Sequence, residues 1–144
     1  MRVLTTLCVL ASLLGCQHLP IEGFTDVQSQ IVHQARVQGV PPHIALAVAE
    51  HESRFTPTAV SKGNYGIMQV QLGTARRFGF TGTAKELLDP NTNIKYGIAV
   101  LAHCYKKYAF DLMSLGCYNG AITFNSTYIR EVLNKSKKYQ LMLK

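Results

Sequence analysis

The sequence predicts a single, mostly α-helical domain, and three observations lead to this prediction. The chain has 144 residues, 47% of them hydrophobic and 16% charged, which is the composition of a folded globular protein. The part of the chain that follows a leader-like N-terminus has roughly 125 residues. A domain of this size can bury a hydrophobic core without disulfides or metals. Helix start and stop signals recur along this part, whereas the alternating pattern of strands is scarce.

The N-terminus carries the features of an export signal. Arg2 precedes an apolar run over residues 3–14, which is too short to span a bilayer as a helix. The run ends at Gly15-Cys16, which resembles the lipobox of bacterial lipoproteins, where the cysteine becomes lipid-modified. An ordinary cleaved signal is the alternative. We therefore predict a signal peptide over 1–15, a tether over 16–25, and one folded domain over 26–144.

Helix signals then follow in order along the domain. Asp26 is predicted to cap a first helix that stops at Gly39, and the prolines at 41 and 42 open a second helix over residues 43–54. Residues 56–66 read as a turn-rich loop. A long helix is predicted to start at Asp89-Pro90, and Asp89 and Asp111 both read as helix caps. The remaining predicted helices cover residues 74–78, 90–108, 111–117 and 127–135.

Charge and cysteine content restrict the classes of partner and cofactor. The net charge of +7 is spread along the chain, without a dense basic stripe interleaved with aromatics, so an anionic cell envelope is a more natural partner than nucleic acid. No spacing of Cys or His matches a zinc site, and the HExxH-like start at His51-Glu52 has Phe55 where the second histidine is required. We therefore expect neither a metal nor a cofactor.

Cys104 and Cys117 remain as an even pair in an exported chain. The helices that carry them are joined by a short connection, so they are expected to be antiparallel neighbours. We predict a disulfide between the two cysteines. The alternative is two small apolar residues that fill the core.

The second predicted helix places two carboxylates on different sides. At about 100° per residue, Glu52 lies at the edge of an apolar arc, whereas Glu50 points roughly the opposite way. A carboxyl group held against apolar surface loses hydration of its charged form, which raises its pKa and suits it to act as a general acid. The alternative is that Glu52 caps a loop by accepting backbone N–H bonds.

Four motifs occur in order between residues 27 and 135. They are Glu52-Ser53-x-Phe55-x-Pro57-x-Ala59-x-Ser61, Gly66-Ile67-Met68-Gln69 with Thr74-Ala75, Leu88-Asp89-Pro90-x-x-Asn93-Ile94-x-x-Gly97, and Tyr118-Asn119. Together they resemble the soluble lytic transglycosylase family. The resemblance implies a lysozyme-like α+β fold, mostly helical, with a cleft between Glu52 and residues 66–69.

The resemblance also implies a site and a reaction. Glu52 matches the catalytic glutamate, and the expected substrate-binding residues are Ser53, Ser61, Tyr65, Met68, Gln69, Tyr118 and Asn119. Tyr65, Met68 and Tyr118 would supply apolar surface for sugar rings, and the two amides would bind N-acetyl and hydroxyl groups. The implied reaction cleaves the MurNAc-β-1,4-GlcNAc bond of peptidoglycan and forms 1,6-anhydro-MurNAc.

Two alternatives remain open at this point. One is a hydrolase of the same fold, a lysozyme in the strict sense, and the other is a non-catalytic glycan-binding or secretion-assembly protein. The expected location is the periplasm, anchored to the outer membrane through a lipidated Cys16. The small size suggests a dedicated role, such as opening gaps for a secretion or conjugation apparatus. The chain departs from the family pattern at Gly120, one position early, so the shape of the loop after Asn119 stays undetermined.

Overall fold

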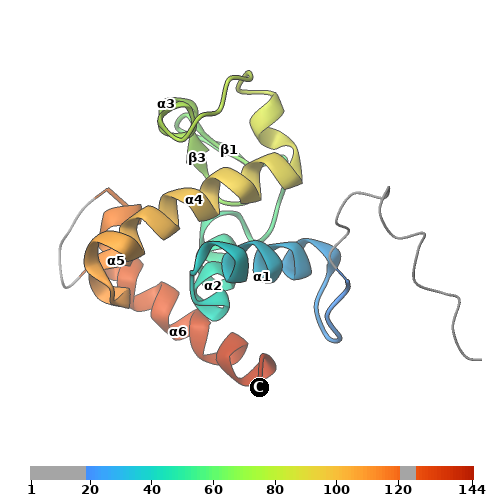
Figure 1. Ribbon diagram of the computed structural model, residues 1–144, viewed down its shortest axis with the longest axis vertical. Coiled ribbons are helices and arrows are strands. Elements are labelled where there is room, and N and C mark those ends of the chain that lie inside the picture. Colours follow the sequence, from blue (N-terminus) through green and yellow to red (C-terminus); the bar gives the residue numbers. More distant parts are fainter. Residues whose placement is uncertain (1–18, 121–125) are drawn as a thin grey trace, which may run out of the picture.

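The fold is organised around one helix, α2 (Pro42–Ser53), which is buried on all sides. The computed structural model describes residues 19–120 and 126–144, and it packs α1 (Asp26–Gln38) and α6 (Thr127–Met142) directly against α2 (Figure 1). All six residues from Ile44 to Ala49 have no exposed surface. The one-sided apolar arc expected from the sequence therefore underestimates the burial, because neighbouring helices also cover the other side of α2.

The ends of α1 correct one expectation and confirm another. Thr25, and not Asp26, caps the helix: its side chain accepts from the backbone N–H of Gln28, and the Gln28 side chain accepts from the N–H of Thr25. This capping box satisfies two free N–H groups at once, which a single aspartate does not. Gly39 ends the helix in the left-handed conformation with φ 72°, as predicted.

A small antiparallel sheet follows α2, where the sequence predicts only turns and a short apolar segment. Its strands are β1 (Val60–Ser61), β2 (Asn64–Tyr65) and β3 (Val70–Gln71), in that spatial order, with Tyr65 opposite both Val60 and Val70. Strands of two residues are too short to leave an alternating pattern in the sequence. The sheet gives the fold its α+β character, and the helices dominate it.

The remaining elements lie around α4 (Pro90–Tyr108), the long helix that crosses the molecule (Figure 1). Asp89 caps α4 as predicted, because its side chain accepts from the N–H of Thr92 at 2.8 Å. Short elements flank it: α3 (Leu72–Arg77), the 3₁₀ helix η1 (Glu86–Leu88) and α5 (Asp111–Tyr118). The prediction that Asp111 is a cap is wrong, since Phe110 occupies that position and Asp111 accepts a hydrogen bond from the Tyr105 hydroxyl.

Helix α6 extends well past the predicted end at residue 135 and reaches Met142. The residues after 135 are rich in lysine, so the sequence shows no clear apolar helical pattern there. Ser136 and Tyr139 are nevertheless only 6% and 3% exposed and face the core. Burial of these two side chains therefore holds the last turns of α6 on the rest of the domain.

The predicted signal peptide and Cys16 lie outside the described residues, as does the loop directly after Gly120. Within residues 19–120 and 126–144, no helix is both long and apolar enough to cross a membrane.

Helices α4 and α5 are joined covalently. A disulfide links Cys104 to Cys117, with 5.8 Å between their Cα atoms and a sequence separation of 13. It ties the last turns of α4 to α5, which has only eight residues. A helix this short is unstable alone, so its position depends on such attachments.

We predict that reduction of the Cys104–Cys117 disulfide lowers the free energy of unfolding by about 3 kcal/mol, the entropy of closing a short loop. Urea denaturation of mature protein with and without reductant measures the difference. Thiol counting on denatured protein made without reductant is expected to find neither of these two cysteines. Two reactive thiols besides Cys16 would contradict the disulfide.

Candidate active site

A pocket of about 760 Å³ opens beside the C-terminal end of α2. Its walls come from α2, the sheet, α3, α4 and α5. The residues that line it are Glu52, Asn64, Gln69, Val70, Gln71, Thr74, Arg77, Phe78, Val100, His103, Cys104, Cys117, Tyr118, Asn119 and Gly120. Among these described residues, Glu52 carries the only carboxyl group, so any acid–base chemistry of a carboxyl in this pocket belongs to Glu52.

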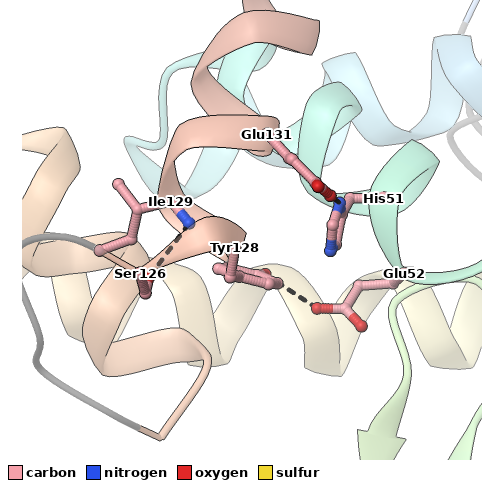
Figure 2. Close-up of polar contacts among 6 residues, drawn as sticks. All are labelled: His51, Glu52, Ser126, Tyr128, Ile129 and Glu131. Atoms are coloured by element: carbon pink, nitrogen blue, oxygen red, sulfur yellow. Dashed lines mark hydrogen bonds and ion pairs between the residues drawn. The ribbon is translucent and has the colours of Figure 1, made fainter.

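Glu52 lies in the last turn of α2 and is largely buried. The hydroxyl of Tyr128 donates to its Oε1 at 2.8 Å (Figure 2). Burial raises the pKa of Glu52, and the hydrogen bond from Tyr128 offsets part of this effect, so that the pKa stays above its usual value. The hydrogen-bond partner of Glu52 is a side-chain hydroxyl, whereas the loop-capping alternative requires backbone N–H groups. The environment favours a carboxyl group that holds its proton at higher pH than an exposed glutamate does.

Glu50, two residues earlier on α2, has the opposite environment. Its carboxylate accepts from Lys138 Nζ at 2.7 Å and from the Tyr139 hydroxyl at 2.8 Å. Burial acts to raise the pKa of Glu50, but these hydrogen bonds and the charge of Lys138 outweigh it and lower the pKa. Glu50 therefore remains a carboxylate that joins α2 to α6.

Tyr128 lies in the first turn of α6 and belongs to none of the motifs found in the sequence. Ser126 caps that turn, since its Oγ accepts from the N–H of Ile129 at 3.2 Å (Figure 2). Burial and the charge of Glu52 raise the pKa of Tyr128 far above its usual value, so its hydroxyl keeps its proton and donates. The predicted helix over 127–135 includes Tyr128, but nothing in the sequence links this residue to a glutamate 76 positions earlier.

His51 supports the same contact from the side. Its ring meets the Tyr128 ring edge-on with 4.8 Å between centroids, and its Nδ1 lies 3.5 Å from Glu131 Oε2 (Figure 2). Two consecutive residues of α2 therefore contact the first turns of α6, which restricts the position of the Tyr128 hydroxyl.

Ser53 fixes the wall next to Glu52. Its hydroxyl donates to the carbonyl of Ile67 at 2.7 Å and accepts from the N–H of Thr56 at 3.1 Å. The hydroxyl is thus engaged by the backbone, and Ser53 supports the segment Gly66–Gln69. A direct contact between Ser53 and a substrate stays a prediction.

The structure corrects the apolar sugar-facing surface expected from Met68. Its side chain is fully buried and packs against Gly97, where an added Cβ would lie 2.5 Å from the Met68 Cβ. The side chain therefore presents no surface to a sugar ring. The motif marks Met68 for its backbone: its N–H donates to Asn93 and its carbonyl accepts from Tyr118.

The other expected site residues divide into two groups. Gln69, Tyr118 and Asn119 line the pocket together with Glu52. Tyr118 donates its hydroxyl to the carbonyl of Met68 at 2.7 Å, and Asn119 is exposed at the end of α5. Ser61 is exposed on β1, and Tyr65 packs half-buried against the core, so neither is among the residues that form the pocket wall.

The part of the chain that the structure describes contains no cluster of three or more His, Cys, Asp or Glu side chains suited to a metal ion.

The sequence of this chain is similar to those of known proteins. The model of the transglycosylase SLT domain matches residues 29–141. The endo-type membrane-bound lytic murein transglycosylases A of Salmonella typhimurium and Salmonella enteritidis are 42% identical over 72 residues. These matches cover 44% of this chain and 36% of each relative, so the chain matches about a third of their length.

Solved structures have the same fold. The lytic transglycosylase Slt of Pseudomonas aeruginosa, solved as an inactive mutant, superposes with a TM-score of 0.71 at 22% identity, over 81% of this chain and 24% of that one. The 70-kDa soluble lytic transglycosylase of Escherichia coli superposes with a TM-score of 0.59 at 28% identity, over 75% of this chain and 18% of that one. The predicted lysozyme-like, mostly helical fold is confirmed. Since the family model matches most of the chain, the protein belongs to the transglycosylase SLT domain family.

Proposed function

We propose that this protein cleaves the glycan strands of peptidoglycan as a lytic transglycosylase, with Glu52 as its one catalytic carboxyl. The observation that carries the proposal is the environment of Glu52, which is largely buried, accepts a hydrogen bond from Tyr128 and is the only carboxyl among the described residues of the pocket. Membership of the family and the names of the relatives, lytic murein transglycosylases, support the same activity.

The proposed mechanism uses Glu52 twice. Protonated Glu52 gives its proton to the oxygen that bridges MurNAc and GlcNAc as the sugar becomes oxocarbenium-like. The resulting carboxylate then takes a proton from the C6 hydroxyl of the muramic residue, which attacks C1 and closes the 1,6-anhydro ring. Because the nucleophile belongs to the substrate, no second carboxylate is needed to activate water, in contrast to the usual glycosidase pair.

The pocket supplies groups suited to a saccharide. Tyr118 offers an aromatic surface, and the amides of Gln69, Asn119 and Asn64 offer donors and acceptors for N-acetyl and hydroxyl groups. The reaction as proposed requires no cofactor.

We further propose that Cys16 carries a lipid anchor in the outer membrane, behind a signal peptide over 1–15 and a tether over 16–25. This placement would bring the domain 26–144 to periplasmic peptidoglycan. The relatives are themselves named membrane-bound, which supports an enzyme that acts at a membrane surface.

Replacing Glu52 by Gln is expected to reduce cleavage of purified sacculi by roughly 10²–10⁴-fold, because it removes the only proton-carrying group of the mechanism. Glu50→Gln is the matched control on the same helix and should keep activity, with folding of both checked by circular dichroism. The reverse pattern would contradict the assignment. Mass analysis of the products should find anhydro-muramic ends, whereas reducing ends, heavier by one water, would identify a hydrolase.

Tyr128→Phe is expected to shift the alkaline limb of the kcat/KM profile to higher pH. The Tyr128 hydroxyl stabilises the carboxylate form of Glu52, so its loss raises the pKa of Glu52 and keeps the acid protonated further up the pH scale. Tyr139→Phe is the control, because it removes a hydrogen bond from Glu50 only. An alkaline limb that stays in place or moves to lower pH in Tyr128→Phe would argue against this role.

Cys16→Ser should move the protein from the membrane fraction to the soluble periplasm, because it removes the site of acylation. Fractionation followed by immunodetection measures the distribution. Gln17 follows the cysteine, which favours outer-membrane over inner-membrane vesicles in the wild type. A soluble distribution of the unaltered protein would rule out the lipid anchor.

A further inference from the structure

The wall of the pocket formed by α3 and α4 carries a positive charge that the proposed chemistry does not use. Arg77 and Phe78 come from the end of α3, and His103 comes from α4. The Phe78 and His103 rings meet edge-on with 5.8 Å between centroids, which holds the two helices together at this point. We propose that this wall is a subsite for the carboxylates of the lactyl or peptide substituent on muramic acid, with Arg77 as the cation that binds them.

The guanidinium of Arg77 is oriented but not neutralised. Its Nη2 donates to Thr74 Oγ1 at 3.1 Å, within the same turn of α3. The two ion pairs recorded among the described residues join His51 to Glu131 and Lys138 to Glu50. The remaining donors of Arg77 are therefore available to an anion in the pocket, and a guanidinium can bind a carboxylate through two parallel hydrogen bonds.

The charges within the pocket are unequally placed. Glu52 is the only described lining residue with a carboxyl group, and it belongs to α2, whereas Arg77 belongs to the α3 wall. In the proposed mechanism Glu52 is protonated when the substrate binds. An anionic substituent on the α3 side would therefore meet an attractive charge and no competing carboxylate.

The chemistry of the substrate, which rests on the proposed function, supplies such an anion on one sugar only. GlcNAc is neutral, whereas each muramic residue carries a lactyl ether whose carboxyl group is either free or joined to a peptide with its own carboxylates. A cation on one wall would therefore recognise muramic acid and fix which of the two alternating glycosidic bonds lies at Glu52. The Phe78 ring beside it offers apolar surface for the lactyl methyl group.

Binding of soluble glycan fragments tests the subsite separately from catalysis. The Glu52→Gln protein prevents turnover, and Arg77→Gln, Arg77→Lys or Arg76→Gln is added to it. Arg76 is the matched control, since it is exposed on the same helix and is not part of the pocket wall. With fragments that carry either intact peptides or a free lactyl carboxylate, Arg77→Gln should weaken binding about tenfold, Arg77→Lys should weaken it less, and Arg76→Gln should leave it unchanged.

Two modified fragments identify the source of the carboxylate. Fragments with all carboxylates converted to amides should bind the Arg77→Gln and parent proteins equally. Fragments whose peptides have been removed expose the lactyl carboxylate, which is an amide in intact fragments. An effect of Arg77→Gln found only with peptide-free fragments assigns the subsite to the lactyl carboxylate, and an effect found only with intact fragments assigns it to the peptide. Equal binding of Arg77→Gln and Arg76→Gln to both kinds of fragment would overturn the inference. Failure of the unaltered protein to cleave sacculi would instead overturn the proposed function.

Discussion

One buried amide, that of Asn93, fixes the wall of the pocket that lies next to Glu52. Its Oδ1 accepts from the N–H of Met68 at 2.7 Å, and its Nδ2 donates to the carbonyls of Tyr65 and Leu87 at 2.6 and 2.8 Å. Asn93 has no exposed surface, so no water can replace these bonds, and their loss would leave buried backbone groups unpaired. The close approach of Asn93 also explains why residue 66 is a glycine, because a Cβ there would lie 2.4 Å from Asn93 Nδ2. The loop and the start of α4 are therefore built as one unit.

Helix α6 gives the two glutamates of α2 their different properties. Glu50 and Glu52 are two residues apart, so their side chains leave the helix in nearly opposite directions. Near its end, α6 presents Lys138 and Tyr139 to Glu50, and the net effect of their contacts is to lower the pKa of Glu50. At its start, α6 presents only the neutral Tyr128 hydroxyl to Glu52, whose pKa burial keeps raised. A single packing interface thus keeps one carboxyl ionised and lets the other hold a proton.

The sequence predicts this architecture where the local signals are strong and misses it where contacts are distant or local signals are weak. Asp89-Pro90 marks the start of α4 because cap and proline act within one turn, and Gly39 marks the end of α1 for the same reason. Tyr128 is missed because its partner lies 76 residues away. Met68 is assigned to the right segment but to the wrong role, since a motif identifies a position and not the direction of its side chain. The two-residue strands are missed because they have no periodicity.

The segment 66–69, of which Gln69 lines the pocket, is held from three helices at once, which leaves little for a ligand to reorganise. Ser53 of α2 holds the carbonyl of Ile67, Asn93 of α4 holds the N–H of Met68, and Tyr118 of α5 holds the carbonyl of Met68. The hydrogen bond from Tyr118 would be the weakest of the three without further support for α5, because α5 is too short to be stable alone. The disulfide at Cys117 precedes Tyr118 directly and anchors α5 to α4, so the covalent bond keeps the Tyr118 ring in the pocket and its hydroxyl on the wall. Groups held in place before binding need no ordering at the moment of reaction, and here that rigidity depends on a bond outside the proposed chemistry.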